Sequence, residues 1–193
     1  MKKVKMLDDT DRLLLKTLSK YPGMNQVRIA KEIGLTQPAI SLRLRKLKRM
    51  GLINDLGMLL DATALGLKMT KVDLRVKNQD ALTKKFRRCP VVANSYTLEE
   101  DNGMCMILAG ESEQFLNCMV AHHLRKNPDV INISSKHMVS SAHGFRTNMN
   151  FEQKLDAPPC GDDPCDTCEY YIDNGGECPG CPVTKFYKGT FWK

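Results

Sequence analysis

Residues 35–51 read LTQPAISLRLRKLKRMG and form the most constraining segment of the chain. Thr36 is suited to cap a helix, and proline at position 38 is tolerated in a first turn, where its missing N–H costs nothing. Three apolar side chains recur at helical spacing and form the face that must be buried: Ile40, Leu44 and Leu47. Gly51 is a typical helix stop. The segment predicts an amphipathic helix over residues 36–50.

The charge of this helix is one-sided. Between residues 36 and 50 there are five Lys or Arg side chains and no acidic one. Residues 1–66 hold 13 basic and 6 acidic side chains, residues 67–153 hold 12 and 9, and residues 154–193 hold 4 and 7. The net charge of +7 is therefore concentrated at the N-terminal end. A solvated surface helix usually mixes signs, so this excess indicates a polyanionic partner such as a nucleic acid. The helix-turn-helix described next makes double-stranded DNA the expected partner.

The residues before this helix predict two more helices. Residues 8–19 have leucines at helical spacing, and Asn25 can cap a second short helix that ends before Gly34. Two helices joined by a short glycine-containing turn, the second of them basic, are typical of a helix-turn-helix. Residues 52–60 suggest a small β-wing. We therefore expect a winged helix-turn-helix domain over residues 1–62 and a linker over 63–68.

The middle of the chain alternates strand and helix patterns, so the expected fold class is α+β. The expected strands are 69–76, 91–98, 103–109 and 130–139, and the expected helices are 80–88 and 112–126. The order β-α-β-β-α-β is that of a ferredoxin-like sandwich. We expect this domain over residues 69–153.

Residues 154–193 are rich in loops and too short to bury a core of their own. Five of the eight cysteines lie here: Cys160, Cys165, Cys168, Cys178 and Cys181. Two C-x-x-C pairs separated by nine residues suit one metal ion, since each pair can supply two thiolates from a tight turn. The sequence predicts a metal-stapled tail with one metal centre at Cys165, Cys168, Cys178 and Cys181. Cys160 is a fifth thiol that can replace one of these ligands or act in redox chemistry.

The nature of this centre stays open at the sequence level. Zinc and an iron–sulfur cluster suit four thiolates equally, and disulfides are a third alternative. The centre can hold the tail together or sense metal or redox state. Cys89, Cys105 and Cys118 are read as small core residues, and the four histidines show no paired ligand spacing.

The first two segments resemble the Lrp/AsnC family of transcription regulators over residues 7–141. The resemblance rests on Leu7-Asp8-x-x-Asp11-Arg12-x-Leu14-Leu15, the helix-turn-helix, Gly51-Leu52-Ile53 and Asp61-x-x-x-Leu65-Gly66. It implies a homodimer that pairs sheet to sheet, often assembles into octamers and binds pseudo-palindromic sites. The family's amino-acid effector loop usually has a glycine and an aspartate around an aromatic residue, and residues 98–104 lack this pattern.

The basic helix divides into two sets of candidate DNA-binding residues. Thr36, Gln37, Pro38 and Ser41 are expected to meet base edges in the major groove, and Arg45 can reach guanine. Arg43, Lys46, Lys48 and Arg49 are expected mostly to contact phosphate.

The leading interpretation is a sequence-specific DNA-binding transcription regulator that is not an enzyme. The alternatives are an enzyme similar to sirohaem decarboxylases on the same fold, or an architectural DNA-binding protein with little sequence preference. No apolar run approaches the length of a membrane span, and the basic start lacks the apolar core of a signal peptide. A cytoplasmic location is therefore expected.

Overall fold

The computed structural model describes residues 7–53, 60–142, 144–147, 155–173 and 178–192. It divides into two compact units, Met1–Gly57 and Met58–Lys193. None of the described helices has the length and apolar character that crossing a membrane requires.

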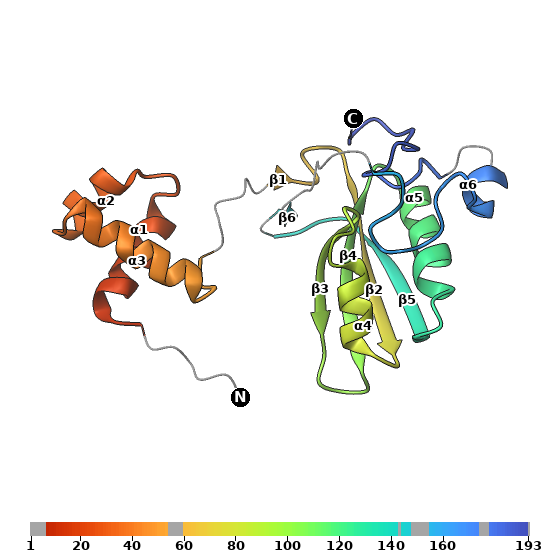
Figure 1. Cartoon of the computed structure of the whole chain (residues 1–193), viewed down its shortest axis with the longest axis horizontal. Helices are drawn as coiled ribbons and strands as arrows, with labels where there is room; N and C mark the ends of the chain where they lie inside the picture. Colours follow the sequence, from red (N-terminus) through yellow and green to blue (C-terminus); the bar gives the residue numbers. More distant parts are fainter. Residues whose placement is uncertain (1–6, 54–59, 143, 148–154, 174–177, 193) are drawn as a thin grey trace. The chain divides into compact units, whose positions relative to one another are not determined.

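The first unit is a bundle of three helices: α1 (Asp9–Lys20), α2 (Gln26–Ile33) and α3 (Gln37–Arg49) (Figure 1). Asp8 starts α1 by accepting a hydrogen bond from the Asp11 backbone N–H at 2.7 Å. Asn25 caps α2 in the same way, and Gly34 ends it at a φ of 76°. The predicted helix order is confirmed.

The apolar stripe of α3 packs into the core of this unit, as the sequence predicted. Ile40 and Leu47 are fully buried together with Leu14 of α1 and Ile29 of α2, and Leu44 is partly buried against them. The expected wing falls largely on residues 54–59, which lie outside the described residues. Leu60, at the end of the expected wing, lies in the short strand β1 (Leu60–Asp61), which pairs with β6 (Arg146–Thr147) in the second unit.

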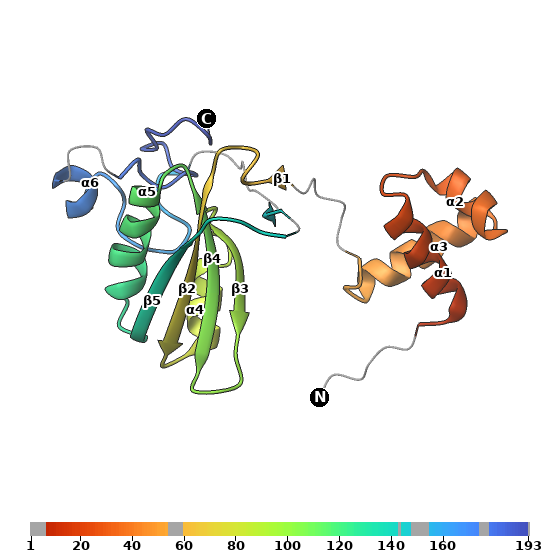
Figure 2. The same cartoon turned by 180° about the vertical axis from the view of Figure 1, so that it is seen from behind.

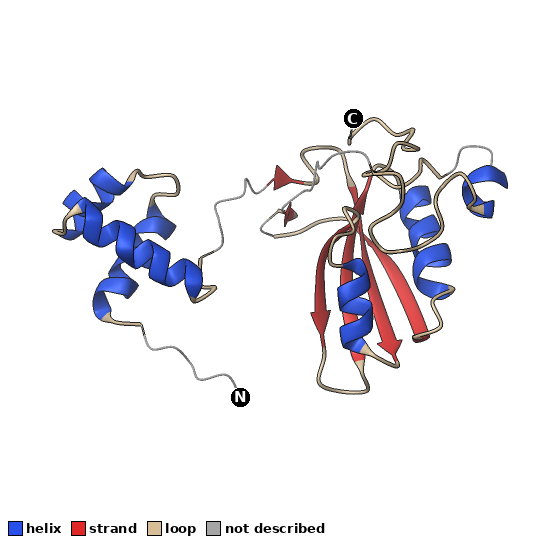
Figure 3. Cartoon of the chain, viewed as in Figure 1, coloured by secondary structure: helices blue, strands red, loops and turns tan. Residues whose placement is uncertain are grey.

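The second unit contains a four-stranded antiparallel sheet in the order β3-β4-β2-β5 (Figure 2). Its elements are β2 (Lys68–Val76), α4 (Gln79–Phe86), β3 (Val92–Thr97), β4 (Gly103–Gly110), α5 (Glu113–Cys118), η1 (Met119–Arg125) and β5 (Val130–Met138). This order and topology confirm the ferredoxin-like β-α-β-β-α-β arrangement. The helices cover one face of the sheet, where Val72 and Met106 pack against Phe86 of α4 and Leu116 of α5 (Figure 3).

The second long helix differs from its prediction in one respect. The sequence predicts one helix over 112–126, and the structure begins it with Ser112 as the capping residue. After Cys118 the helix continues as a π-helix, η1, which carries His122 and His123. Apolar periodicity cannot distinguish one α-helical segment from an α-helix that continues as a wider turn. π-helical turns are rare and frequently lie at functional sites.

The tail belongs to the second unit and contains the short helix α6 (Glu169–Asp173). Its aromatic end docks onto the domain, because Tyr187 and Trp192 are buried in a cluster with Leu67, Met69 and Ala109. Glu111 fixes this end by accepting hydrogen bonds from the backbone N–H groups of Thr190 at 2.7 Å and Phe191 at 2.5 Å.

Candidate nucleic-acid interface and cysteine cavity

Helix α3 is positioned by its ends. Thr36 occupies the N-cap position, but its side chain makes no capping hydrogen bond. The side-chain amide of Gln37 donates a hydrogen bond from Nε2 to Gln26 Oε1 at 3.1 Å, which links α3 to α2. At the other end Gly51 adopts a φ of 70°, and the Leu52 N–H donates to the Leu47 carbonyl at 3.0 Å. This is the glycine stop that the sequence predicted.

Most of the predicted DNA-reading edge faces solvent. The side chains of Thr36, Gln37, Pro38 and Arg45 are exposed, and Ser41 is half-buried. Lys48 and Arg49 are exposed as well and line a shallow depression together with Leu42 and Arg45. Leu42, which lies off the apolar stripe, is 58% exposed. This edge is accessible within the unit that carries it.

Arg43 and Lys46 have partners inside the unit. Arg43 Nη1 lies 2.7 Å from both Asp8 Oδ2 and Asp11 Oδ1, and Lys46 Nζ lies 2.6 Å from Asp11 Oδ2. The hydrogen bond from Arg43 holds the pKa of Asp8 below its usual value. Burial raises the pKa of Asp11, but the hydrogen bonds from Lys46 and Arg43 outweigh that effect and lower it. These two cations therefore join α1 to α3, and their predicted contacts with phosphate stay a prediction.

The five cysteines of the tail line one cavity. A cavity of about 40 Å³ is lined by six of the eight cysteines: Cys89, Cys160, Cys165, Cys168, Cys178 and Cys181. The Cys181 N–H donates to Cys165 Sγ at 3.4 Å, so the two C-x-x-C pairs are in direct contact. The eight cysteines all lie in the described residues, and none of them forms a disulfide. The cavity holds all four predicted metal ligands and the fifth thiol, Cys160.

Burial favours the protonated form of three thiols that line the cavity. It raises the pKa of Cys160 and Cys178 to about 11 and that of Cys181 to about 12. These three thiols are therefore neutral at neutral pH, and a metal ion that binds them must displace their protons. The thiols line one cavity, although no three of the four predicted ligands have their sulfur atoms within 4.8 Å of one another.

The interpretation of Cys89 and Cys118 as core residues does not describe all of their contacts. Cys89 is buried among the apolar residues of the second unit, as expected, but it also lines the cysteine cavity. Cys118 is buried too and lies 2.7 Å from the Tyr170 hydroxyl of the tail. No spacing in the sequence connects these two cysteines with the tail.

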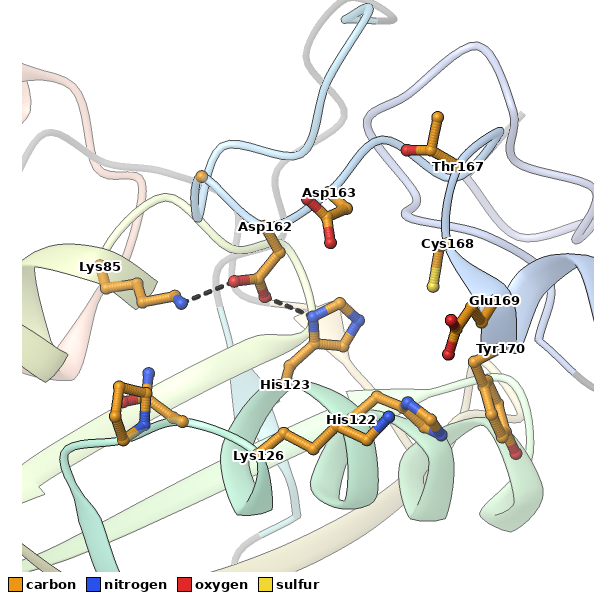
Figure 4. A pocket seen from close by; sticks show the side chains of 13 residues that line it. Lys85, His122, His123, Lys126, Asp162, Asp163, Thr167, Cys168, Glu169 and Tyr170 are labelled. Carbon is orange, nitrogen blue, oxygen red and sulfur yellow. Dashed lines mark hydrogen bonds and ion pairs between the residues drawn. The ribbon is translucent and has the colours of Figure 1, made fainter.

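Histidine 123 is the functional candidate that the sequence did not reveal. Among the described residues, the ligand atoms of His123, Cys160 and Asp162 all lie within 4.8 Å of one another, whereas the four predicted cysteine ligands do not form such a group. Figure 4 shows the Asp162 carboxylate between the His123 ring and the Lys85 ammonium. His123 and Asp162 are 39 positions apart, so only the docking of the tail brings them together.

Known proteins are similar to this chain in sequence. A family described as "Winged helix-turn-helix DNA-binding" matches residues 7–54. The Bacillus subtilis transcriptional regulator AzlB is 25% identical over 143 residues, which cover 70% of this chain and 90% of that protein. The leucine-responsive regulatory protein of Rhizobium meliloti is 29% identical over 153 residues, which cover 78% of this chain and 93% of that protein. The chain is therefore similar in sequence to curated transcription regulators over most of their length.

Solved structures of Lrp/AsnC proteins share its fold. The structure of Escherichia coli AsnC matches with a TM-score of 0.59 at 17% identity and covers 72% of this chain and 95% of that one. The leucine response regulatory protein LrpA of Mycobacterium tuberculosis matches with a TM-score of 0.62 at 20% identity, over 70% of this chain and 94% of that one. These Lrp/AsnC structures are matched almost completely, while part of the present chain has no counterpart in them.

Proposed function

We propose that this chain is a sequence-specific DNA-binding transcription regulator that acts as a homo-oligomer. The observation that carries the proposal is the exposed, acid-free edge of α3 in a helix-turn-helix with a complete core. The names of the relatives, which are transcription regulators, support a regulator over an enzyme. The resemblance to the Lrp/AsnC family implies association through the second unit, whose fold AsnC and LrpA share.

In the proposed interface, different residues of α3 contact the bases and the phosphates. Thr36, Gln37, Pro38 and Ser41 lie at the helix start, which is the end that meets base edges in helix-turn-helix complexes. We assign the reading of guanine to Arg45 and the main phosphate contacts to Lys48 and Arg49. Arg43 and Lys46 are already engaged by Asp8 and Asp11, so in this proposal they orient α3 and contribute less to phosphate binding.

A binding-site selection followed by affinity measurements tests this assignment. The selected sequence and a random duplex are titrated with the wild-type chain, Arg45→Ala and Lys48→Ala. Arg45→Ala is expected to lose most on the selected sequence, whereas Lys48→Ala is expected to weaken binding to both duplexes alike. Lys84→Ala, which removes one exposed charge from the other unit, is the control for net charge. Equal losses on both duplexes for Arg45→Ala would contradict the assignment, and a selection without any consensus would favour an architectural protein.

We further propose one metal centre in the cysteine cavity, held by Cys165, Cys168, Cys178 and Cys181, through which the regulator responds to metal or redox state. The convergence of six thiols on one cavity and the N–H···S contact between the two pairs support it. Metal analysis and the visible spectrum of anaerobically purified protein test it. Zinc in a colourless sample identifies a zinc centre, and iron with sulfide and a brown colour identifies a cluster. A purified chain without metal that also fails to bind zinc or iron would overturn the centre.

A further inference from the structure

His123, Cys160 and Asp162 form a compact set of three different ligand types beside the cysteine cavity. The Asp162 Oδ2 atom contacts His123 Nδ1 and lies 3.5 Å from Cys160 Sγ. All three side chains are half-buried. Ligand atoms around one tetrahedral Zn²⁺ ion are about 3.5 Å apart, given metal–ligand distances of about 2.0–2.3 Å. Cys160 Sγ and Asp162 Oδ2 are therefore already at the spacing that a shared ion requires. The His123 and Asp162 atoms are in hydrogen-bond contact and would move apart to admit the ion between them.

Lys85 holds the carboxylate in the orientation that a metal ion needs. Its ammonium lies 2.6 Å from Asp162 Oδ1, the oxygen that does not face His123 (Figure 4). Oδ2 is thus left to act as a single-oxygen ligand toward the imidazole and the thiol. Partners that fix a ligating group in this way are common around metal sites.

A simple ion pair does not account for the whole arrangement. The Lys85 ammonium alone balances the charge of Asp162, and together with the His123 hydrogen bond it would anchor the tail without any metal. Such an anchor does not require the Cys160 thiol, which donates a hydrogen bond to the same carboxylate oxygen, Asp162 Oδ2. His123 is also carried by the π-helical segment η1, a type of turn that is frequent at functional sites.

We propose that His123, Cys160 and Asp162 bind a divalent transition-metal ion such as Zn²⁺ at a site separate from the four-cysteine centre. Imidazole, thiolate and carboxylate are all ligands of this ion. Three protein ligands leave a fourth position for water or a small ligand, as in zinc sites with an open coordination position. The site borders an open pocket of about 520 Å³ lined in part by His122, Lys126 and Tyr170, from which that position is reachable.

Cobalt titration of the full chain, freed of metal under reducing and anaerobic conditions, tests the site. Co²⁺ bound through thiolate gives visible absorption that reports each site. The wild-type chain is expected to bind two ions, one in each site. His123→Ala and Asp162→Asn are expected to bind one ion at the four-cysteine centre as the wild-type chain does. Their affinity for the second ion is expected to fall at least about tenfold. Circular dichroism is recorded for each variant to confirm that it is folded.

Two neighbouring residues are matched controls, and a background variant separates the sites. His122→Ala and Asp163→Asn change side chains that line the same pocket but lie outside the set, and both are expected to bind two ions. In a Cys168→Ser, Cys178→Ser chain, the four-cysteine centre is disabled and one ion is expected at the remaining site. Failure of the four-cysteine centre alone would therefore leave this binding intact. Wild-type binding by folded His123→Ala and Asp162→Asn, or equal losses in His122→Ala, would overturn the proposal.

Discussion

Arg43 of α3 and Asp11 of α1 lie in contact, with Arg43 Nη1 2.7 Å from Asp11 Oδ1, although the Asp11 side chain is completely shielded from solvent. A buried carboxylate is tolerated only when it is paired and hydrogen-bonded. Asp11 meets this condition through Arg43 and Lys46 from α3. A polar network therefore joins the first helix of the bundle to the proposed recognition helix.

Replacing Asp11 by asparagine is expected to destabilise the helical unit by about 1–3 kcal/mol, because two charge-assisted hydrogen bonds are removed. Asp9→Asn changes an exposed neighbour in the same helical turn and is expected to have a much smaller effect. Urea unfolding followed by circular dichroism measures both. Equal stability of Asp11→Asn and the wild-type chain would show that the network does not stabilise the unit.

The same network makes the stability of this unit depend on pH. The pKa values of Asp8 and Asp11 in the folded state lie below the ordinary value of 3.8, so the folded state favours their charged forms. Their contribution is complete well above pH 3.8 and is lost as the pH falls through the lowered values. The stability difference between the wild-type chain and Asp11→Asn should therefore shrink below about pH 4. A constant difference between pH 7 and pH 3 would contradict this mechanism.

Two leucines on α3 offer a matched comparison of core and surface. Leu47 is fully buried, whereas Leu42 is 58% exposed. Leu47→Ala is expected to cost about 2–5 kcal/mol of stability and to abolish DNA binding through unfolding. Leu42→Ala is expected to change stability by less than about 0.5 kcal/mol. If Leu42→Ala keeps its stability and loses affinity only for sites with a particular thymine, Leu42 contacts that thymine methyl group.

The salt dependence of DNA binding tests the proposed phosphate contacts. Removing the side chain that neutralises one phosphate should reduce the slope of log affinity against log salt by about 1. Lys48→Ala and Arg49→Ala are expected to show this reduction, and Lys84→Ala in the other unit is expected to keep the wild-type slope. A weaker affinity of Lys48→Ala with an unchanged slope would mean that this lysine acts other than through phosphate.

Glu111→Gln is expected to loosen the aromatic end of the chain. The Glu111 carboxylate accepts hydrogen bonds from Thr190 and Phe191, next to the chain's single tryptophan, Trp192, which is 3% exposed. The variant should shift tryptophan fluorescence to longer wavelength and increase its quenching by acrylamide. Glu100→Gln, which changes an exposed carboxylate, is the control. Unchanged quenching in Glu111→Gln would contradict the anchoring role.

The sequence predicted the features that depend on local periodicity and on end signals. The stripe of Ile40, Leu44 and Leu47 and the glycine at position 51 were sufficient for α3. Alternation in residues 69–76 and the glycine-bounded apolar run at 103–109 located two of the four strands. The contacts that join distant segments could not be predicted in this way. His123 has no partner at ligand spacing along the chain, because Asp162 reaches it only after the tail has docked. The ion pairs that engage Arg43 and Lys46 depend on how α1 packs against α3.

The hydrogen bonds from Thr190 and Phe191 to Glu111 span 79 and 80 positions. Contacts of such separation form late, because the chain between their ends must first be closed into a loop. Thr190 and Phe191 are synthesised long after the strands of the sheet, and the second unit is complete only when they have bound Glu111. The three-helix unit relies on contacts within residues 7–53 and can form well before Thr190 is synthesised. A nascent chain would thus hold its DNA-binding unit folded while the unit that carries the cysteines is still unfinished.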